Sequence, residues 1–186
     1  LAFVAGFFLF RLYTTLGKRT GAERPAEPAP APVQGELPRE RPAEPPPVGA
    51  ANGDGVMAIV RADPSFDVDH FLAGARGAYE MIVAAFAKGD RDTLRGLLAP
   101  RVYESYQIAI AKREEGGGHG PELVRLKSVE LVDAALDGGV ARVAVKFEAE
   151  LAEGAHGVRE ARERWTFERD VRSSDPNWRL ARVSAA

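Results

Sequence analysis

The pattern of residues 142–151 constrains the fold more than any other part of this chain. Apolar side chains at Val143, Val145, Phe147, Ala149 and Leu151 fall on one side, and the charged residues Arg142, Lys146, Glu148 and Glu150 fall on the other. Successive side chains of a strand point to opposite faces. The pattern therefore predicts an antiparallel strand with one buried face and one face in water. The apolar face of such a sheet has to be covered by another layer.

Three further strands are expected around this one. The first strand is expected over Leu123–Leu136, and the hairpin signal Asp137-Gly138-Gly139 joins it to this strand. A turn over Glu153–Gly157 leads to a third strand, which has Trp165 and Phe167 on its buried face. An Asp175-Pro176-Asn177 turn leads to the last strand, which carries Trp178 and Leu180. We expect both tryptophans to be core residues and the Asp-Pro-Asn segment to be a structural turn.

Helical spacing precedes the strands. Phe71, Leu72, Ala75, Tyr79, Ile82, Val83 and Phe86 recur on one helix face. Ser65 is the expected N-cap, Gly89 the expected end, and Asp90 the cap of a second short helix. A third helix should run from Pro100 to Glu115. The predicted fold class is α+β, with the N-terminal helices packed on one face of a four-stranded antiparallel sheet.

The N-terminal part has a different composition. Residues 1–10 are wholly apolar and are followed by Arg11, Lys18 and Arg19. Because a membrane span needs about 20 apolar residues, we expect residues 1–16 to be an N-terminally clipped membrane anchor. A signal peptide and a buried soluble helix are the alternatives. Positive charges after the run predict a domain that faces the cytoplasm.

A basic and then proline-rich stretch over residues 17–55 should be a flexible linker, because proline fixes φ and removes a backbone donor. The apolar patch Val56–Val60 either docks on the following domain, which we favour, or forms a small interfacial helix. We assign the folded domain to residues 56–186.

Composition excludes several classes of function. Cysteine is absent, so disulfides and thiolate metal sites cannot form. The three histidines are far apart in sequence, and the cluster Asp67, Asp69 and His70 fits helix-start carboxylates better than a metal or acid/base site. The net charge of −2, with 25 basic and 27 acidic residues, gives no reason to expect nucleic acid. We predict no catalytic, cofactor or metal residues.

Four side chains are candidates for lining a cavity between helices and sheet: Tyr79, Ile82, Tyr103 and Tyr106. The alternative is that the tyrosines are core residues with their hydroxyls at the rim. The predicted buried faces offer no carboxylate that could act as a general acid.

Specific segments carry a family resemblance. The first helix region contributes Phe66-Asp67, which leads into Phe71-Leu72-Ala73-Gly74-Ala75-Arg76, and then Gly89-Asp90. The last two strands contribute Trp165-Thr166-Phe167-Glu168-Arg169-Asp170 and Asp175-Pro176-Asn177-Trp178. Over Asp63–Val183 the chain resembles the Tim44-like domain family, and its basic N-terminal stretch is similar to that of membrane-anchored bacterial members. The resemblance implies an NTF2-like cone with an apolar cavity.

The same resemblance implies a non-catalytic adaptor at the bacterial inner membrane with a single N-terminal span. Its expected partners are membrane phospholipid and a membrane or client protein, with an Hsp70-type chaperone as one candidate; the oligomeric state stays open. Two alternatives remain: a carrier or sensor that holds an acyl chain in the cavity, and a cavity enzyme of the isomerase or dehydratase kind.

Overall fold

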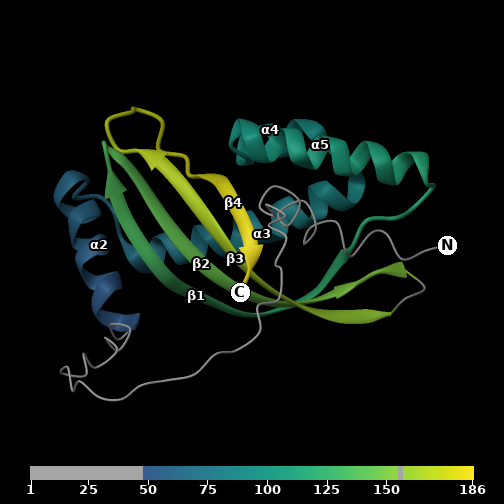
Figure 1. Cartoon of the computed structure of the whole chain (residues 1–186), viewed down its shortest axis with the longest axis horizontal. Helices are drawn as coiled ribbons and strands as arrows, with labels where there is room; N and C mark the ends of the chain where they lie inside the picture. Colours follow the sequence, from purple (N-terminus) through teal and green to yellow (C-terminus); the bar gives the residue numbers. More distant parts are fainter. Residues whose placement is uncertain (1–47, 155–156) are drawn as a thin grey trace, which may run out of the picture.

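Four helices precede a four-stranded sheet in the computed structural model, which describes residues 48–154 and 157–186 (Figure 1). The elements are α2 (Val48–Ala62), α3 (Val68–Lys88), α4 (Arg91–Leu97), α5 (Pro100–Glu115), β1 (Glu122–Asp137), β2 (Val140–Ala152), β3 (Val158–Asp170) and β4 (Arg179–Ala185). The strands pair in the order β1-β2-β3-β4, each antiparallel to its neighbour. The predicted α+β class is therefore confirmed.

The helix boundaries follow side-chain caps. Asp67, and not Ser65, is the N-cap of α3, and its carboxylate accepts a hydrogen bond from the backbone N–H of His70 at 2.7 Å. The prediction of Ser65 was wrong because its hydroxyl instead donates to the carboxylate of Asp63, at 2.6 Å. Gly89 ends α3 in the left-handed region with φ of 71°, and Asp90 caps α4, as the sequence predicted.

Helix α2 begins at Val48, inside the stretch that we expected to be linker. The Val56–Val60 patch docks on the domain, since Ile59 is completely buried. Gly55 lies so close to β1 that a Cβ atom there would sit 1.8 Å from the carbonyl oxygen of Ala134. Just beyond the helix, Asp63 forms an ion pair with Arg169 of β3. The described part of α2 is thus an integral layer of the fold.

The sheet is strongly curved (Figure 1), and most of its pairing irregularities lie between β1 and β2. The pairing of β1 with β2 shifts register three times, between Leu123 and Arg125, between Leu126 and Ser128, and between Leu131 and Asp133. Each shift inserts an extra residue, which bends the strand and increases its twist. The β1–β2 turn uses Gly138 and Gly139, both at positive φ (57° and 88°), as the hairpin signal predicted.

The core lies between the inner face of the sheet and the helices. Every predicted inward residue of β2 is at most 1 % exposed, and Trp165 and Phe167 of β3 are 2 % exposed. Both aromatic side chains are core residues, as predicted. Trp178 lies just before β4 rather than in it, is only partly buried, and contacts Phe71 with ring centroids 4.8 Å apart.

No helix in the described ranges is long and apolar enough to cross a membrane. The predicted anchor, residues 1–16, and residues 17–47 of the predicted linker lie outside the described residues.

Candidate functional site

A small pocket lies between the helices and the inner face of the sheet. Its walls come from α3, α5, the segment before β1 and two strands: Tyr79, Ile82, Val83, Phe86, Tyr106, Pro121, Leu151, Glu163 and Trp165. Three of the four residues that we expected around a cavity, Tyr79, Ile82 and Tyr106, are therefore brought together here.

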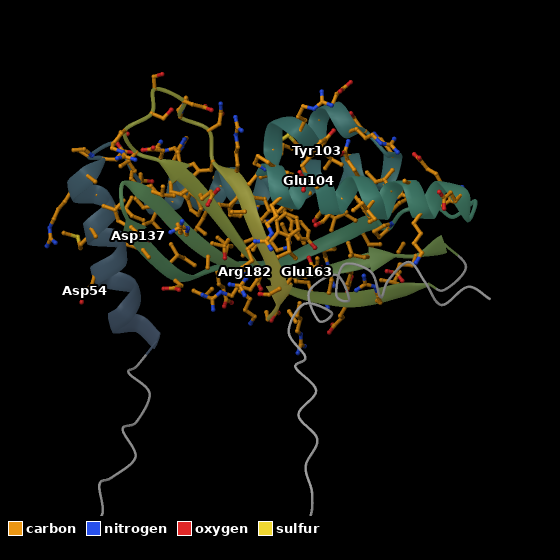
Figure 2. The ribbon with its side chains drawn as sticks, turned by 45° about the horizontal axis from the view of Figure 1, so that its top comes forward. Asp54, Tyr103, Glu104, Asp137, Glu163 and Arg182 are labelled. Atoms are coloured by element: carbon orange, nitrogen blue, oxygen red, sulfur yellow. The ribbon has the colours of Figure 1, made fainter. Side chains whose placement is uncertain are left out.

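Tyr103, the fourth candidate, does not line this pocket. Its hydroxyl accepts hydrogen bonds from the side chains of Gln107 at 3.0 Å and Arg95 at 3.3 Å. The Arg95 guanidinium also lies over the ring, 5.5 Å from its centroid. Tyr103 thus belongs to a polar contact between α4 and α5, on the helical layer and apart from Glu163 (Figure 2).

The pocket is much smaller than the apolar cavity that the resemblance implied. The space open to the centre of a water molecule is about 10 Å³, which is roughly the room that one water needs. Pockets that hold drug-sized ligands measure roughly 300–1,000 Å³. Neither an acyl chain nor a substrate of that size fits in this conformation.

Glu163 is the site residue that the sequence interpretation missed. It lies two residues before Trp165 on β3, so it shares the inner face with Trp165 and Phe167. Its Oε2 accepts a hydrogen bond of 3.0 Å from the indole N–H of Trp165. Extending the alternation of Trp165 and Phe167 by one step back would have found it. The expectation that the buried faces carry no carboxylate was wrong.

Burial is the main influence on the electrostatics of Glu163. Desolvation raises the pKa of its carboxyl group above the ordinary value, while the Trp165 hydrogen bond and the charge of Arg159 act in the opposite direction. Arg159 lies on the same strand and pairs with Glu153 at 2.5 Å. The site thus contains a carboxyl group that is easier to protonate than a surface glutamate.

Two tyrosine hydroxyls lie within electrostatic reach of Glu163. Burial and then the negative charge of Glu163 raise the pKa of both Tyr79 and Tyr106, so both phenols stay protonated near neutral pH. The Tyr79 ring packs against Phe147 and Trp165, with centroid distances of 4.6 Å to each. Within the described part of the protein, its fully buried hydroxyl finds no hydrogen-bond partner.

The polar candidates at the start of α3 have a structural role. Asp67 caps the helix through the backbone of His70, which agrees with the interpretation that we favoured over a metal site. Across residues 48–154 and 157–186, no group of three or more histidine, aspartate or glutamate side chains is placed to hold a metal ion.

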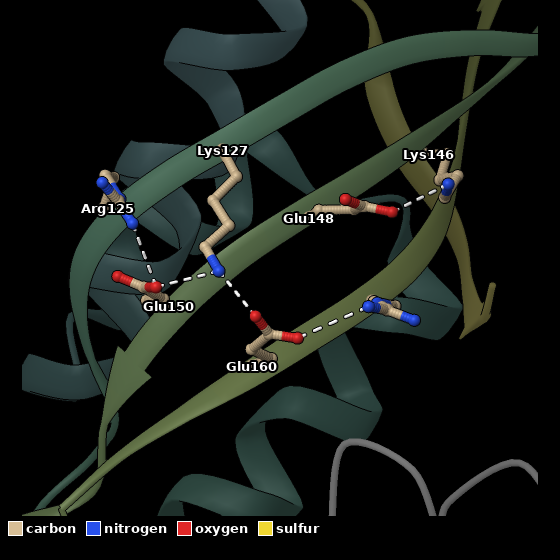
Figure 3. A network of polar contacts seen from close by, with 7 residues as sticks. Arg125, Lys127, Lys146, Glu148, Glu150 and Glu160 are labelled. Carbon is tan, nitrogen blue, oxygen red and sulfur yellow. Dashed lines mark hydrogen bonds and ion pairs between the residues drawn. The ribbon is translucent and has the colours of Figure 1, made fainter.

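The outward face of the sheet carries a network of ion pairs (Figure 3). Lys127 of β1 bridges Glu150 of β2 at 2.9 Å and Glu160 of β3 at 2.6 Å, and Arg125 adds a contact to Glu150 at 3.1 Å. Lys146 and Glu148 pair along β2 at 2.8 Å. Charges of both signs alternate across the strands, so this face is a hydrated, internally neutralised surface.

A comparison with models of known protein families identifies one domain in this chain. The model of the Tim44-like domain matches residues 53–185, which covers the described fold from α2 to β4. The search of curated proteins found no match.

Two solved structures show a more distant likeness. The intermembrane space region of the chloroplast protein ARC6 is 18% identical, with a TM-score of 0.48, over 66% of this chain and 98% of that chain. A SEC-C motif containing protein from Rhodopseudomonas palustris is 18% identical, with a TM-score of 0.34, over 55% of this chain and 71% of that chain. At such low identities and TM-scores, neither likeness bears on function.

Proposed function

Because this chain belongs to the Tim44-like domain family, we propose that it is a non-catalytic adaptor that binds a partner at the bacterial inner membrane. The partner classes are membrane phospholipid and a membrane or client protein, with an Hsp70-type chaperone as one candidate. The observation that carries the proposal is the family match over residues 53–185, which takes in every described helix and strand except residues 48–52 at the start of α2.

The dimensions of the pocket support binding over turnover. A cavity enzyme of the isomerase or dehydratase kind needs an acid inside a cavity that also admits substrate. Glu163 supplies such an acid, but the pocket around it has room for about one water. The same limit applies to a carrier that encloses an acyl chain. Partner contacts are therefore assigned to the outside of the domain.

The arrangement along the chain supports a role at the membrane. The apolar run over residues 1–10 is followed by basic residues and a proline-rich stretch before the folded domain. An anchor and a spacer hold a binding domain at high local concentration near the bilayer. In this proposal the N-terminal span crosses the inner membrane once and the domain faces the cytoplasm.

The test is to identify partners by crosslinking in native membranes and then to measure direct binding. The purified full-length protein is titrated with each crosslinked protein, with an Hsp70-type chaperone and with liposomes of anionic and neutral phospholipid. Saturable micromolar binding to one of them supports the adaptor. The proposal fails if none binds while a small molecule is turned over and Glu163→Gln stops that turnover.

A further inference from the structure

We propose that α5 is a hinged lid over the pocket between α3, α5 and the sheet. Its N-terminal end is fixed to β4 and acts as the pivot, whereas its C-terminal end is held to the junction of α3 and α4 by a polar clasp that opens. This inference concerns motion within the domain and does not depend on the adaptor role. It rests on how each end of α5 is attached and on how little of the helix is buried.

The N-terminal end of α5 is fastened to the sheet. The backbone N–H of Ala99, the residue before the helix, donates a hydrogen bond of 2.9 Å to the carbonyl oxygen of Leu180 in β4. The preceding residue, Leu98, pairs with Leu180 as an isolated parallel bridge and is 1 % exposed. These contacts fix the point where α5 begins, so a displacement of the helix has to be a rotation about this end.

The C-terminal end of α5 leads into a segment that allows this rotation. Residues 116–120 are Gly-Gly-Gly-His-Gly, and residues 116–119 are exposed. The backbone N–H groups of Gly116, Gly117 and Gly118 all donate to carbonyl oxygens in the last turn of α5 itself, and Gly117 has a φ of 64°. Because glycine adopts a wide range of backbone conformations, these residues can change conformation while the end of α5 moves.

Little apolar surface keeps α5 closed. Tyr106, Ala109 and Ile110 are the buried residues of this 16-residue helix, whereas α3 has seven buried residues. Tyr106 lines the pocket and meets Phe86 of α3 edge to face, with ring centroids 5.3 Å apart. Segments with few buried apolar side chains open at a lower free-energy cost than the core does. Of the pocket walls, α5 is therefore the one that moves most easily.

Glu114, in the last turn of α5, is the centre of the clasp. Its carboxylate accepts hydrogen bonds from both Nη atoms of Arg91, at 2.8 and 3.3 Å, and the two side chains stay 50 % and 38 % exposed. Beside it, Arg113 donates to the carbonyl oxygen of Ala87 at 3.2 Å and lies over the Phe86 ring, 4.8 Å from its centroid. An ion pair as exposed as this one contributes little to stability, so the clasp holds the closed position without locking it.

Thiol labelling tests the opening, because the protein has no cysteine of its own. Ala109→Cys places a thiol on the buried face of α5, and Ala141→Cys places one on β2, where the alanine is 0 % exposed. In the full-length protein, Ala109→Cys should react with a maleimide on the order of ten-fold faster, because labelling of Ala141→Cys requires unfolding of the sheet. Equal labelling rates in two variants of equal thermal stability would overturn the proposal.

The second test releases the clasp. Glu114→Gln removes the charge that pairs with Arg91, and Glu115→Gln removes an equal charge from an exposed residue that has no ion pair within the described part of the chain. Combined with Ala109→Cys, Glu114→Gln should speed labelling about two- to five-fold, whereas Glu115→Gln should leave it unchanged. The lid proposal fails if both changes affect Ala109→Cys equally, or if Glu114→Gln speeds the labelling of Ala141→Cys by the same factor.

Discussion

At the scale of single residues, Glu163 is the charge with the most unusual surroundings among the described residues. It lies on the inner face of β3, within reach of Tyr79 on α3, Tyr106 on α5 and Arg159 on its own strand. Because burial raises its pKa, the folded state holds this proton more tightly than the unfolded state. The contribution of Glu163 to stability is therefore fully present below the ordinary glutamate pKa and is lost as pH rises through its raised folded-state pKa.

Glu163→Gln should consequently stabilise the protein at neutral pH and have little effect near pH 4. An uncharged amide removes the cost of a buried carboxylate and still accepts the hydrogen bond from Trp165. Urea denaturation of both proteins at a series of pH values measures the difference. Glu104→Gln, at an exposed position of α5, is the control. A Glu163→Gln protein that is less stable than the wild type at pH 7 would contradict this account.

Phe167→Ala should lower the free energy of unfolding by about 3–5 kcal/mol, the usual effect of truncating a fully buried aromatic residue. Phe167 is 2 % exposed and contacts Phe71 and Phe147, with centroid distances of 6.0 and 6.5 Å. Thermal melting of the full-length variant measures the change, and Thr166→Ala on the outward face serves as the matched control. Unchanged stability in Phe167→Ala would mean that the assignment of faces on β3 is inverted.

At the scale of elements, α2 and the edge strand β1 depend on each other. One side of the helix buries Ile59, and Gly55 lies directly against the β1 backbone. Asp63 then ties the end of this segment to Arg169, whose guanidinium also lies over the Trp178 ring at 5.4 Å from the centroid. Residues separated by more than 100 positions therefore hold α2 in place.

Gly55→Ala should destabilise the docking of α2, since its Cβ would lie 1.8 Å from the carbonyl oxygen of Ala134. Overpacking against a rigid backbone costs about 1–3 kcal/mol. Gly53→Ala is a matched control, because nothing lies within 4 Å of a Cβ at that position and alanine favours helix. Hydrogen exchange of the α2 amides reports the docking. Equal protection in both variants would show that α2 tolerates displacement from β1.

At the scale of the whole molecule, the described domain and the N-terminal segment have separate roles in the proposed function. The domain is a closed α+β unit whose interior admits about one water, and it contains no membrane-spanning helix within the described residues. In the proposed function, the apolar run over residues 1–10 is the segment that attaches the protein to the membrane.

Full-length protein should accordingly remain with membranes after alkaline carbonate extraction, whereas removal of residues 1–20 should release the folded domain. The reason is the wholly apolar run over residues 1–10. Fractionation followed by immunoblotting measures the distribution, and circular dichroism checks that the shortened protein is folded. Recovery of the full-length protein in the soluble fraction would refute the membrane anchor.

The sequence alone determined the α+β class, the α3 stripe, the inward side of β2 and the turn at Gly138-Gly139, because periodicity and backbone preference are local properties. It also supported the family assignment.

The tertiary structure decided the rest. Ser65 does not cap α3, because its hydroxyl donates a hydrogen bond to Asp63. The glycine-rich segment of α2 is helical because it packs on β1. Only the approach of α3 and α5 to the curved sheet determined that Glu163, Tyr79 and Tyr106 share a pocket and that it is small. Volume and desolvation depend on surfaces from distant parts of the chain, and no local pattern encodes them.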